Sequence, residues 1–401
     1  MASVHQAEDC VDLDARERTN RPLLAAPHAQ RALEIAERIV ARAIAWTSER
    51  STEHPETLGG FAGCLLVAEA LARTGGSPPR PLRELAREAL VVSPQRRGLY
   101  DGSAGLLVVL DALDRDGTAF ARPRAALCAA LAEDLLAARA LDPADRPGFD
   151  LIRGAAGKLI ALREVPDDVA AHVRTLFGEL ADRTAERIAD PDPERAGIDI
   201  GVAHGFPGIL AALNVALPHE RALARRYVDL ILAVSHAAGG ARRWDGAWSR
   251  ERTPPPRRAW CYQTAGVAAV LYDRAVVDGD DALRNLALDA LRATIGEPEQ
   301  AGWDDALCHG RSGVALIYAH VARDGDPFAR EAERLALEVL RRYRDDAEFG
   351  YAAFNLVERA EEHRPQFLDA ALGIALFLIE AAVPSERRWL PLLGLRPETR
   401  P

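Results

Sequence analysis

Two cysteines and two histidines stand at matching distances before recurring glycines. Cys261 and Cys308 each lie five residues before a glycine that opens an apolar segment, and His204 and His309 each lie four before such a glycine. Equivalent positions in a repeated fold lie at one height, so the spacing predicts that all four residues share a rim. Two thiols and an imidazole suit zinc, whose catalytic sites hold three protein ligands and keep one position open.

A structural alternative exists for every free cysteine, because unpaired cysteines often behave as small buried apolar residues. We assign Cys10, Cys64 and Cys128 to that class, since none shares an offset with another reactive residue. The matched offsets favour the metal role for Cys261, Cys308 and, with them, His309. A zinc ion there would hold both cysteines as thiolates and lower the pKa of a third thiol, from a substrate.

The glycines that set this register belong to a repeat that runs through the chain. A phrase of glycine (or a substitute), two residues, a second glycine and an apolar helical segment occurs seven times, at spacings of 42 to 60 residues. Such a period fits two helices and their loops. The second glycines are Gly63, Gly105, Gly157, Gly208, Gly266, Gly313 and Gly373.

Each apolar segment follows a more polar one with helical periodicity. Segments 31–50, 81–92 and 221–238 carry apolar residues at i, i+3, i+4 and i+7. We therefore expect an all-α fold with outer amphipathic helices and buried inner helices. An open solenoid needs polar terminal repeats, but the first and seventh inner segments are as apolar as the others. The pattern predicts a closed α/α toroid of seven inner and seven outer helices.

Composition limits the environment and the partners. The chain has 401 residues, 48% of them hydrophobic, with a net charge of −10. The charge argues against nucleic acid as a partner, and no stretch is long and apolar enough for a membrane span. The N-terminus lacks an apolar signal segment, so we expect a cytoplasmic protein. We expect a mobile tail over 1–29, one toroid domain over 30–395 and a C-terminal tail over 396–401.

Three motifs make the chain similar to a known family. AHGFPG (203–208), AWCY (259–262) and CHGRSG (308–313) resemble the signatures of the lanthionine synthetase C-like, or LanC, cyclases, and the repeats extend the resemblance over roughly 30–395. The resemblance implies the same toroid and one Zn²⁺ held by Cys261, Cys308 and His309. It also implies thioether ring closure, in which a peptide cysteine adds to dehydroalanine or dehydrobutyrine of the same peptide and the resulting enolate is protonated.

The resemblance suggests roles for four further residues. His204 is the candidate acid or base. Asp150 would orient His204 or share proton transfer, although an aspartate there could simply cap a helix. Arg257 would steady the enolate by charge. Tyr262 would donate a proton or support the metal site from outside its ligand set.

The chain also departs from the family pattern. Gln263 stands where the family has glycine, and Ala265 stands where it has proline. We expect the added side chain of Gln263 to affect substrate scope more than the metal. The arginine- and proline-rich segment 242–258 is expected to form either a lid over the rim or a solvated connector.

Three other functions compete with the cyclase. A peptide-binding scaffold with structural zinc would have no need of His204, Asp150 and Arg257. A thiol transferase would use the same chemistry but take glutathione from solution. A glycosidase on an α/α toroid needs paired acids facing the centre, whereas the acids here lie mainly on the outer segments. The cyclase reading implies a stand-alone enzyme whose partners are a dehydrated precursor peptide, a separate dehydratase and an exporter.

Overall fold

The computed structural model describes most of the chain. The described residues are 22–50, 57–92, 96–114, 118–189, 198–248, 258–297, 303–355, 360–362, 364–383 and 385–397.

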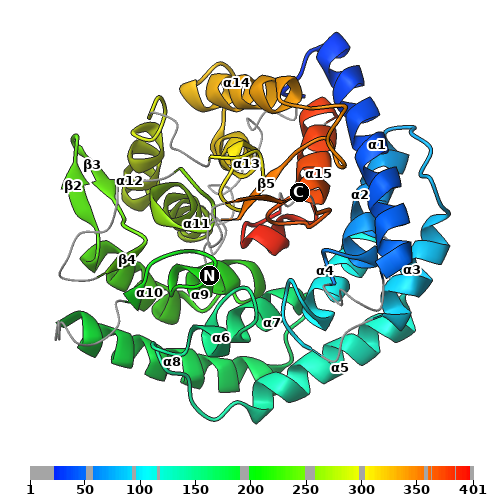
Figure 1. The fold of residues 1–401 in the computed structure, drawn as a ribbon. Helices are drawn as coiled ribbons and strands as arrows, with labels where there is room; N and C mark the ends of the chain where they lie inside the picture. The colour runs from blue at the N-terminus through cyan, green and yellow to red at the C-terminus, as the bar shows by residue number, and fades with distance from the viewer. Residues whose placement is uncertain are drawn as a thin grey trace, which may run out of the picture.

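Fourteen of the described helices form two concentric rings (Figure 1). The inner ring consists of α2 (Phe61–Arg73), α4 (Ser103–Leu113), α7 (Ala155–Ala161), α9 (Pro207–Ala216), α11 (Gln263–Asp278), α13 (Arg311–Val321) and α15 (Ala371–Ala382). The outer ring consists of α1 (Ala26–Arg50), α3 (Leu82–Val91), α5 (Ala121–Ala137), α8 (Asp167–Ala189), α10 (Arg221–Ala233), α12 (Asp281–Arg292) and α14 (Pro327–Arg341). The α/α toroid predicted from the repeat is confirmed.

The ring closes where the two ends of the repeat array meet. Helix α15 contacts α2, so the seventh inner helix is also the neighbour of the first. Helix α1 packs along α15, and the backbone N–H of Leu24 donates to the carbonyl of Ala381 at 2.9 Å. Closure explains why no polar capping repeat is needed at either end.

Burial separates the two rings as their composition predicts. Every residue of α15 is buried, whereas α3 buries only Leu85, Ala86 and Ala89. An inner helix is covered on all sides, and an outer helix buries one stripe and leaves the rest to water.

The second glycine of each repeat is fixed by a close approach. A Cβ on Gly313 would lie 1.8 Å from the carbonyl oxygen of Leu307, and one on Gly266 would lie 1.9 Å from that of Trp260. The other five second glycines approach a preceding carbonyl oxygen in the same way. Any larger residue would push the loop away from the inner helix that it precedes, so the glycines hold each loop tightly over its helix.

Short elements complete the fold. Helix α6 (Arg146–Phe149) precedes α7, and the 3-10 helix η2 (Leu390–Leu393) follows α15. Strand β1 (Ile198–Asp199) pairs with β4 (Ala247–Trp248), β2 (His236–Ala238) with β3 (Ala241–Arg243), and β5 (Ala353–Asn355) with β6 (Ala360–Glu362), all antiparallel.

The helix expected over 221–238 is too long. Helix α10 ends at Ala233, and the chain then forms the β2–β3 hairpin. Gly239 and Gly240 both have positive φ, at 61° and 83°. Two such residues in succession form the tight turn whose twist suits a hairpin, and this turn overrides the helical pattern before it.

The C-terminal segment enters the middle of the ring (Figure 1). The indole N–H of Trp260 donates to the carbonyl of Leu393 at 2.7 Å, and the hydroxyl of Tyr100 donates to that of Leu392. Leu390, Leu392 and Leu393 are buried. The segment therefore fills the centre of the toroid with apolar side chains.

Candidate active site and metal centre

A belt of backbone hydrogen bonds joins the loops that precede the inner helices. In the first six repeats, the backbone N–H of the residue five before the second glycine, or of the residue that precedes it, donates to the carbonyl of the equivalent residue in the next repeat. The residues at this position are Leu58, Tyr100, Ile152, Ala203, Cys261, Cys308 and Leu368. Their N–H···O distances run from 2.9 to 3.4 Å. Equal offsets thus mean equal heights, as the sequence predicted.

Cys261 and Cys308 are neighbours on this belt. The N–H of Cys261 donates to the carbonyl of Cys308 at 3.1 Å, and the N–H of Cys308 donates to that of Leu368 at 2.9 Å. The Cys261 thiol lies against the Cys308 thiol, which raises the pKa of Cys308 well above its ordinary value, and burial and Asp369 raise it further. A bound divalent cation would favour the thiolate form of both cysteines, because metal ligands bind in their deprotonated form.

The residues four before the second glycine form a second circle above the belt. This circle comprises Gly59, Asp101, Arg153, His204, Tyr262, His309 and Asp369. It contains most of the reactive side chains of the rim, and several contact their neighbours in the circle. Arg153 pairs with Asp101 at 3.1 Å, and the ring centroids of His204 and Tyr262 lie 6.2 Å apart.

His309 is held between two carboxylates. Its Nδ1 lies 3.4 Å from Oδ2 of Asp304, and its Nε2 lies 3.7 Å from Oδ1 of Asp369. Burial alone would lower the pKa of His309, but the hydrogen bond and charge of Asp304, with the charge of Asp369, raise it to about 9. The ring is therefore oriented before any metal arrives.

One group of donors has metal-site dimensions. Single donor atoms of Cys308, His309 and Asp369 all lie within 4.8 Å of one another, and no other such trio of Cys, His, Asp or Glu occurs among the described residues. Cys261 stands outside this trio but against Cys308. Sulfur, nitrogen and carboxylate oxygen in a small, half-buried site are donors that zinc accepts, so the residues present fit a zinc ion.

The sequence analysis did not identify Asp369 and Asp304 as site residues. Asp369 occupies the same offset as His309, one repeat later, so the repeat phase could have found it. Asp304 lies in the loop before Cys308. In the sequence, only its closeness to the CHG motif points to it.

His204 and Asp150 form a hydrogen-bonded pair. Nδ1 of His204 lies 2.7 Å from Oδ2 of Asp150, whose side chain is 2% exposed, against 36% for His204. Oδ1 of Asp150 accepts from the backbone N–H groups of Arg153 and Gly154 at 2.7 and 2.9 Å. A carboxylate can only accept, so Nδ1 carries the proton and Nε2 is left as the acceptor nitrogen.

Tyr262 lies beside this pair. Burial raises the pKa of Tyr262, and the neighbouring Asp199 raises it further. Asp199 accepts from the N–H of Gly201 at 2.7 Å and pairs with Arg146 at 3.3 Å. A Cβ on Gly201 would lie 2.7 Å from Cδ1 of Tyr262. The phenol is therefore packed in place and protonated at neutral pH.

The remaining sequence candidates take different positions. Arg257 and Cys10 lie outside the described residues, as do 249–257 of the arginine- and proline-rich segment. The adjacent Arg258 is buried, pairs with Glu331 at 3.2 Å and stacks on Trp303. Cys64 is fully buried in α2 and Cys128 is half-buried on α5.

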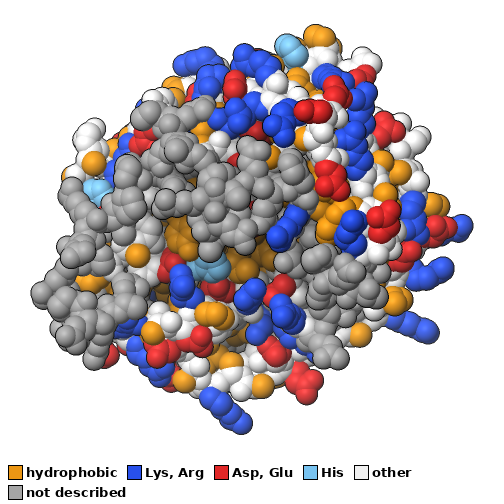
Figure 2. Space-filling model, in the orientation of Figure 1, with side chains coloured by type: hydrophobic (Ala, Val, Ile, Leu, Met, Phe, Trp, Pro, Cys, Tyr) orange, Lys and Arg blue, Asp and Glu red, His pale blue; other side chains and the backbone are white. Residues whose placement is uncertain are grey.

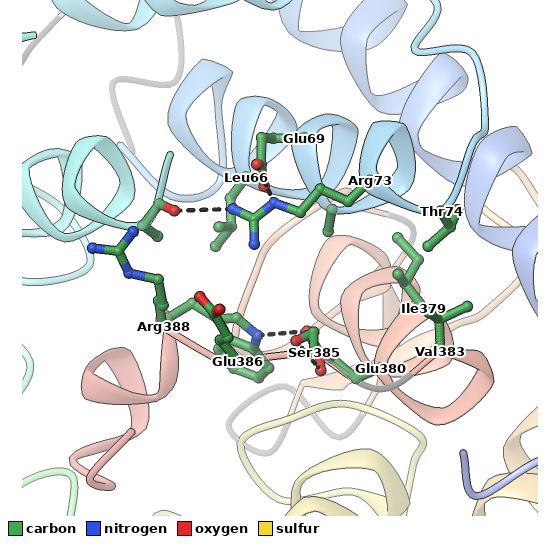
Figure 3. A pocket seen from close by; sticks show the side chains of 13 residues that line it. Leu66, Glu69, Arg73, Thr74, Ile379, Glu380, Val383, Ser385, Glu386 and Arg388 are labelled. Carbon is green, nitrogen blue, oxygen red and sulfur yellow. Dashed lines mark hydrogen bonds and ion pairs between the residues drawn. The ribbon is translucent and has the colours of Figure 1, made fainter. Parts of the chain in front are cut away.

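The rim surrounds a hollow. Figure 2 shows the face seen in Figure 1, with apolar and histidine side chains inside a depression and basic side chains on its border. A separate cleft of about 250 Å³ lies among the C-terminal ends of α2, α4 and α15 (Figure 3). Inner helices present their N-terminal ends to the reactive rim, so this cleft belongs to the opposite end of the toroid. Within it, Arg73 pairs with Glu69 and donates to the carbonyl of Ala112.

Fold and site together define an α/α toroid with a thiol, imidazole and carboxylate donor group on one rim and a His–Asp pair nearby. The chain belongs to the lanthionine synthetase C-like protein family, whose model matches residues 24–393. It is similar in structure to nisin cyclase at a TM-score of 0.65 and 16% identity, over 88% of this chain and 97% of that one. That likeness concerns the fold. No curated protein sequence matches the chain.

Among the described residues, no helix is both long and apolar enough to cross a membrane.

Proposed function

We propose that this protein is a zinc-dependent lanthionine cyclase acting on a dehydrated precursor peptide. The observation that supports this most is the meeting of Cys308, His309 and Asp369 within 4.8 Å, with the Cys261 thiol against Cys308. When bound, zinc would lower the pKa of a peptide thiol at its open position, so that the thiol reacts as thiolate at neutral pH. Cys261, Cys308 and His309 would hold the ion, as the family resemblance implies.

The reaction is an isomerisation of the peptide. The S–H bond of a peptide cysteine and the C=C π bond of dehydroalanine or dehydrobutyrine break. A bond forms from sulfur to the β-carbon, and a C–H bond forms at the α-carbon. The mass of the peptide does not change. The chain must therefore accept one proton from the thiol and deliver one to an enolate carbon.

His204 is suited to that proton transfer. Asp150 holds the Nδ1 proton at 2.7 Å and stabilises a positive charge on the ring. Nε2 of this half-exposed ring can then take a proton and give it back. Tyr262, which burial and the neighbouring Asp199 keep protonated, is a second donor of hydrogen bonds at the same height. Arg257 is proposed to steady the enolate by its charge.

The alternatives make different use of the same residues. A non-catalytic scaffold would have no use for the pairing of half-exposed His204 with buried Asp150. A transferase would need a site for free glutathione and would give products heavier than the peptide. We place the reaction in the cytoplasm, with a separate dehydratase that supplies the substrate and an exporter that removes the product.

The test is to incubate the purified protein with a dehydrated peptide that contains cysteine. Thiols that react with an alkylating reagent should disappear while the peptide mass stays constant. The wild-type chain should hold one zinc, and Cys308→Ala should lose both zinc and cyclisation. Products heavier by one glutathione would instead support the transferase.

A further inference from the structure

We propose that Asp369 is a fourth protein ligand that closes the zinc site between turnovers and is displaced by the incoming peptide thiol. The proposal rests on the proposed zinc site. It assigns to Asp369 a role beyond the ligand set Cys261, Cys308 and His309 that the family resemblance implies.

The backbone holds Asp369 at the metal position. The carbonyl of Leu368, the preceding residue, accepts from the N–H of Cys308 at 2.9 Å, so the seventh loop is tied directly to the sixth. Asp369 occupies the same place in its repeat as His309. The two side chains therefore start from neighbouring points on one circle.

The distance between Asp369 and His309 is compatible with two ligands of one zinc ion. Zinc bonds of 2.0–2.3 Å place neighbouring ligand atoms about 3.3–3.8 Å apart. Oδ1 of Asp369 lies 3.7 Å from Nε2 of His309, and the Asp369 carboxylate lies close to the Cys308 thiol. Cys261, whose thiol lies against that of Cys308 but outside the trio, would complete the set of two sulfurs, one nitrogen and one oxygen after its side chain turns toward the ion.

The two carboxylates beside His309 have different functions. Asp304 faces Nδ1, the usual place for a group that orients a ligand histidine from outside the coordination shell. Asp369 faces Nε2, the nitrogen that is left to bind metal. Asp304 also accepts from the N–H of Ala306 at 3.1 Å, which fixes it within its own loop.

The exposed fractions of the side chains indicate which ligand can leave the metal. The side chain of Asp369 is 50% exposed, whereas those of His309 and Asp304 are 11% and 6% exposed. Of these three side chains, Asp369 is therefore the most accessible to an incoming peptide thiol. Zinc prefers the softer thiolate to a carboxylate, so the exchange would be favourable once the thiol has lost its proton, which Nε2 of His204 can accept, and Asp369 has turned outward.

The consequence is selectivity between thiols. A free thiol at low concentration must compete with Asp369, which is always present. A cysteine of a bound peptide competes at a high effective concentration. Asp369 would therefore keep small free thiols off the metal while it yields to the tethered one.

The experiment measures metal and thiol binding, not turnover. Zinc affinity is obtained by competition with a chelator, and thiol affinity by titrating the cobalt-substituted full chain with N-acetylcysteine and following the sulfur-to-cobalt absorption. Asp369→Ala removes a ligand and should lower the affinity for zinc by about tenfold or more. The same change should tighten N-acetylcysteine binding by a similar factor, because the competitor is gone. Asp369→Asn, similar in size but without the charge, should fall between.

Asp304→Asn is the matched control. It disturbs the orientation of His309, so it should lower the affinity for zinc without raising the affinity for N-acetylcysteine. Weakened binding of both zinc and thiol in Asp369→Ala would make Asp369 a merely structural residue, and unchanged values for both would remove it from the site. Either result overturns the proposal. A wild-type chain that holds no zinc would instead overturn the proposed function.

Discussion

Exchange of Asp150 for asparagine tests the proton-transfer part of the site with little change in shape. In the structure, one carboxylate oxygen accepts from the N–H groups of Arg153 and Gly154, and the other faces Nδ1 of His204 at 2.7 Å. In Asp150→Asn the amide oxygen must stay with the two backbone donors. The amide NH₂ then points at Nδ1, which has to become an acceptor.

The expected magnitude follows from that geometry. The proton moves to Nε2, so the nitrogen that should take a proton from the reacting groups is already occupied, and the negative charge that stabilises the imidazolium is lost. Loss of a general acid or base costs about 10²–10⁴-fold in rate. Both backbone hydrogen bonds of Asp150 remain possible, so the free energy of unfolding should fall by only about 1–2 kcal/mol.

The assay is the initial rate at which alkylatable thiols disappear from a dehydrated peptide, with zinc content measured on the same samples. Zinc should stay bound in Asp150→Asn, in His204→Asn and in the double variant. Because the two residues act as one unit, the double variant should be no slower than either single one. Asp182→Asn serves as control, since Asp182 forms only an exposed ion pair with Arg226. An unchanged rate in Asp150→Asn, or losses that multiply in the double variant, would refute the reasoning.

Two further predictions concern the scaffold. Gly313→Ala should destabilise the protein by about 3 kcal/mol or more, or prevent folding, because its Cβ would lie 1.8 Å from a backbone oxygen. Gly178 lies in the middle of α8, and a Cβ there would have only an Arg226 side-chain atom nearby, at 3.5 Å. Gly178→Ala should therefore raise the free energy of unfolding by about 0.5–1 kcal/mol. Denaturant unfolding measures both glycine variants. Burial raises the pKa of the Cys64 thiol to about 12, so at pH 8 Cys64 should resist iodoacetamide in the native protein and react only after unfolding. Rapid native labelling of Cys64, read by mass spectrometry, would show that α2 is not packed as described.

The repeat phase explains how much of the site was predictable. The offset from the second glycine placed Cys261, Cys308, His204 and His309 at two adjacent heights, and the backbone belt supports that placement. Asp369 has the same offset as His309 but precedes an inner helix that lacks the first glycine, where a lone aspartate is easily taken for a helix cap. Sequence spacing gives a height and a position round the ring, but not the direction of a side chain.

Other details depend on contacts that no pattern records. The pairing of Asp150 with His204 joins residues 54 positions apart, and only the family resemblance suggested it. The helical periodicity of 221–238 hid the β2–β3 hairpin, because the turn depends on two glycines after the pattern. Gln263 takes a φ of 68°, a conformation more natural to the glycine it replaces.

The measurement that tests the central claim most directly compares the wild-type chain with Cys308→Ala and His204→Asn on one dehydrated peptide. Zinc per chain, alkylatable thiols and peptide mass are recorded together. The account predicts one zinc and closed rings at constant mass for the wild type, no zinc and no rings for Cys308→Ala, and bound zinc with slow closure for His204→Asn. Ring closure at the wild-type rate by Cys308→Ala freed of zinc would contradict it.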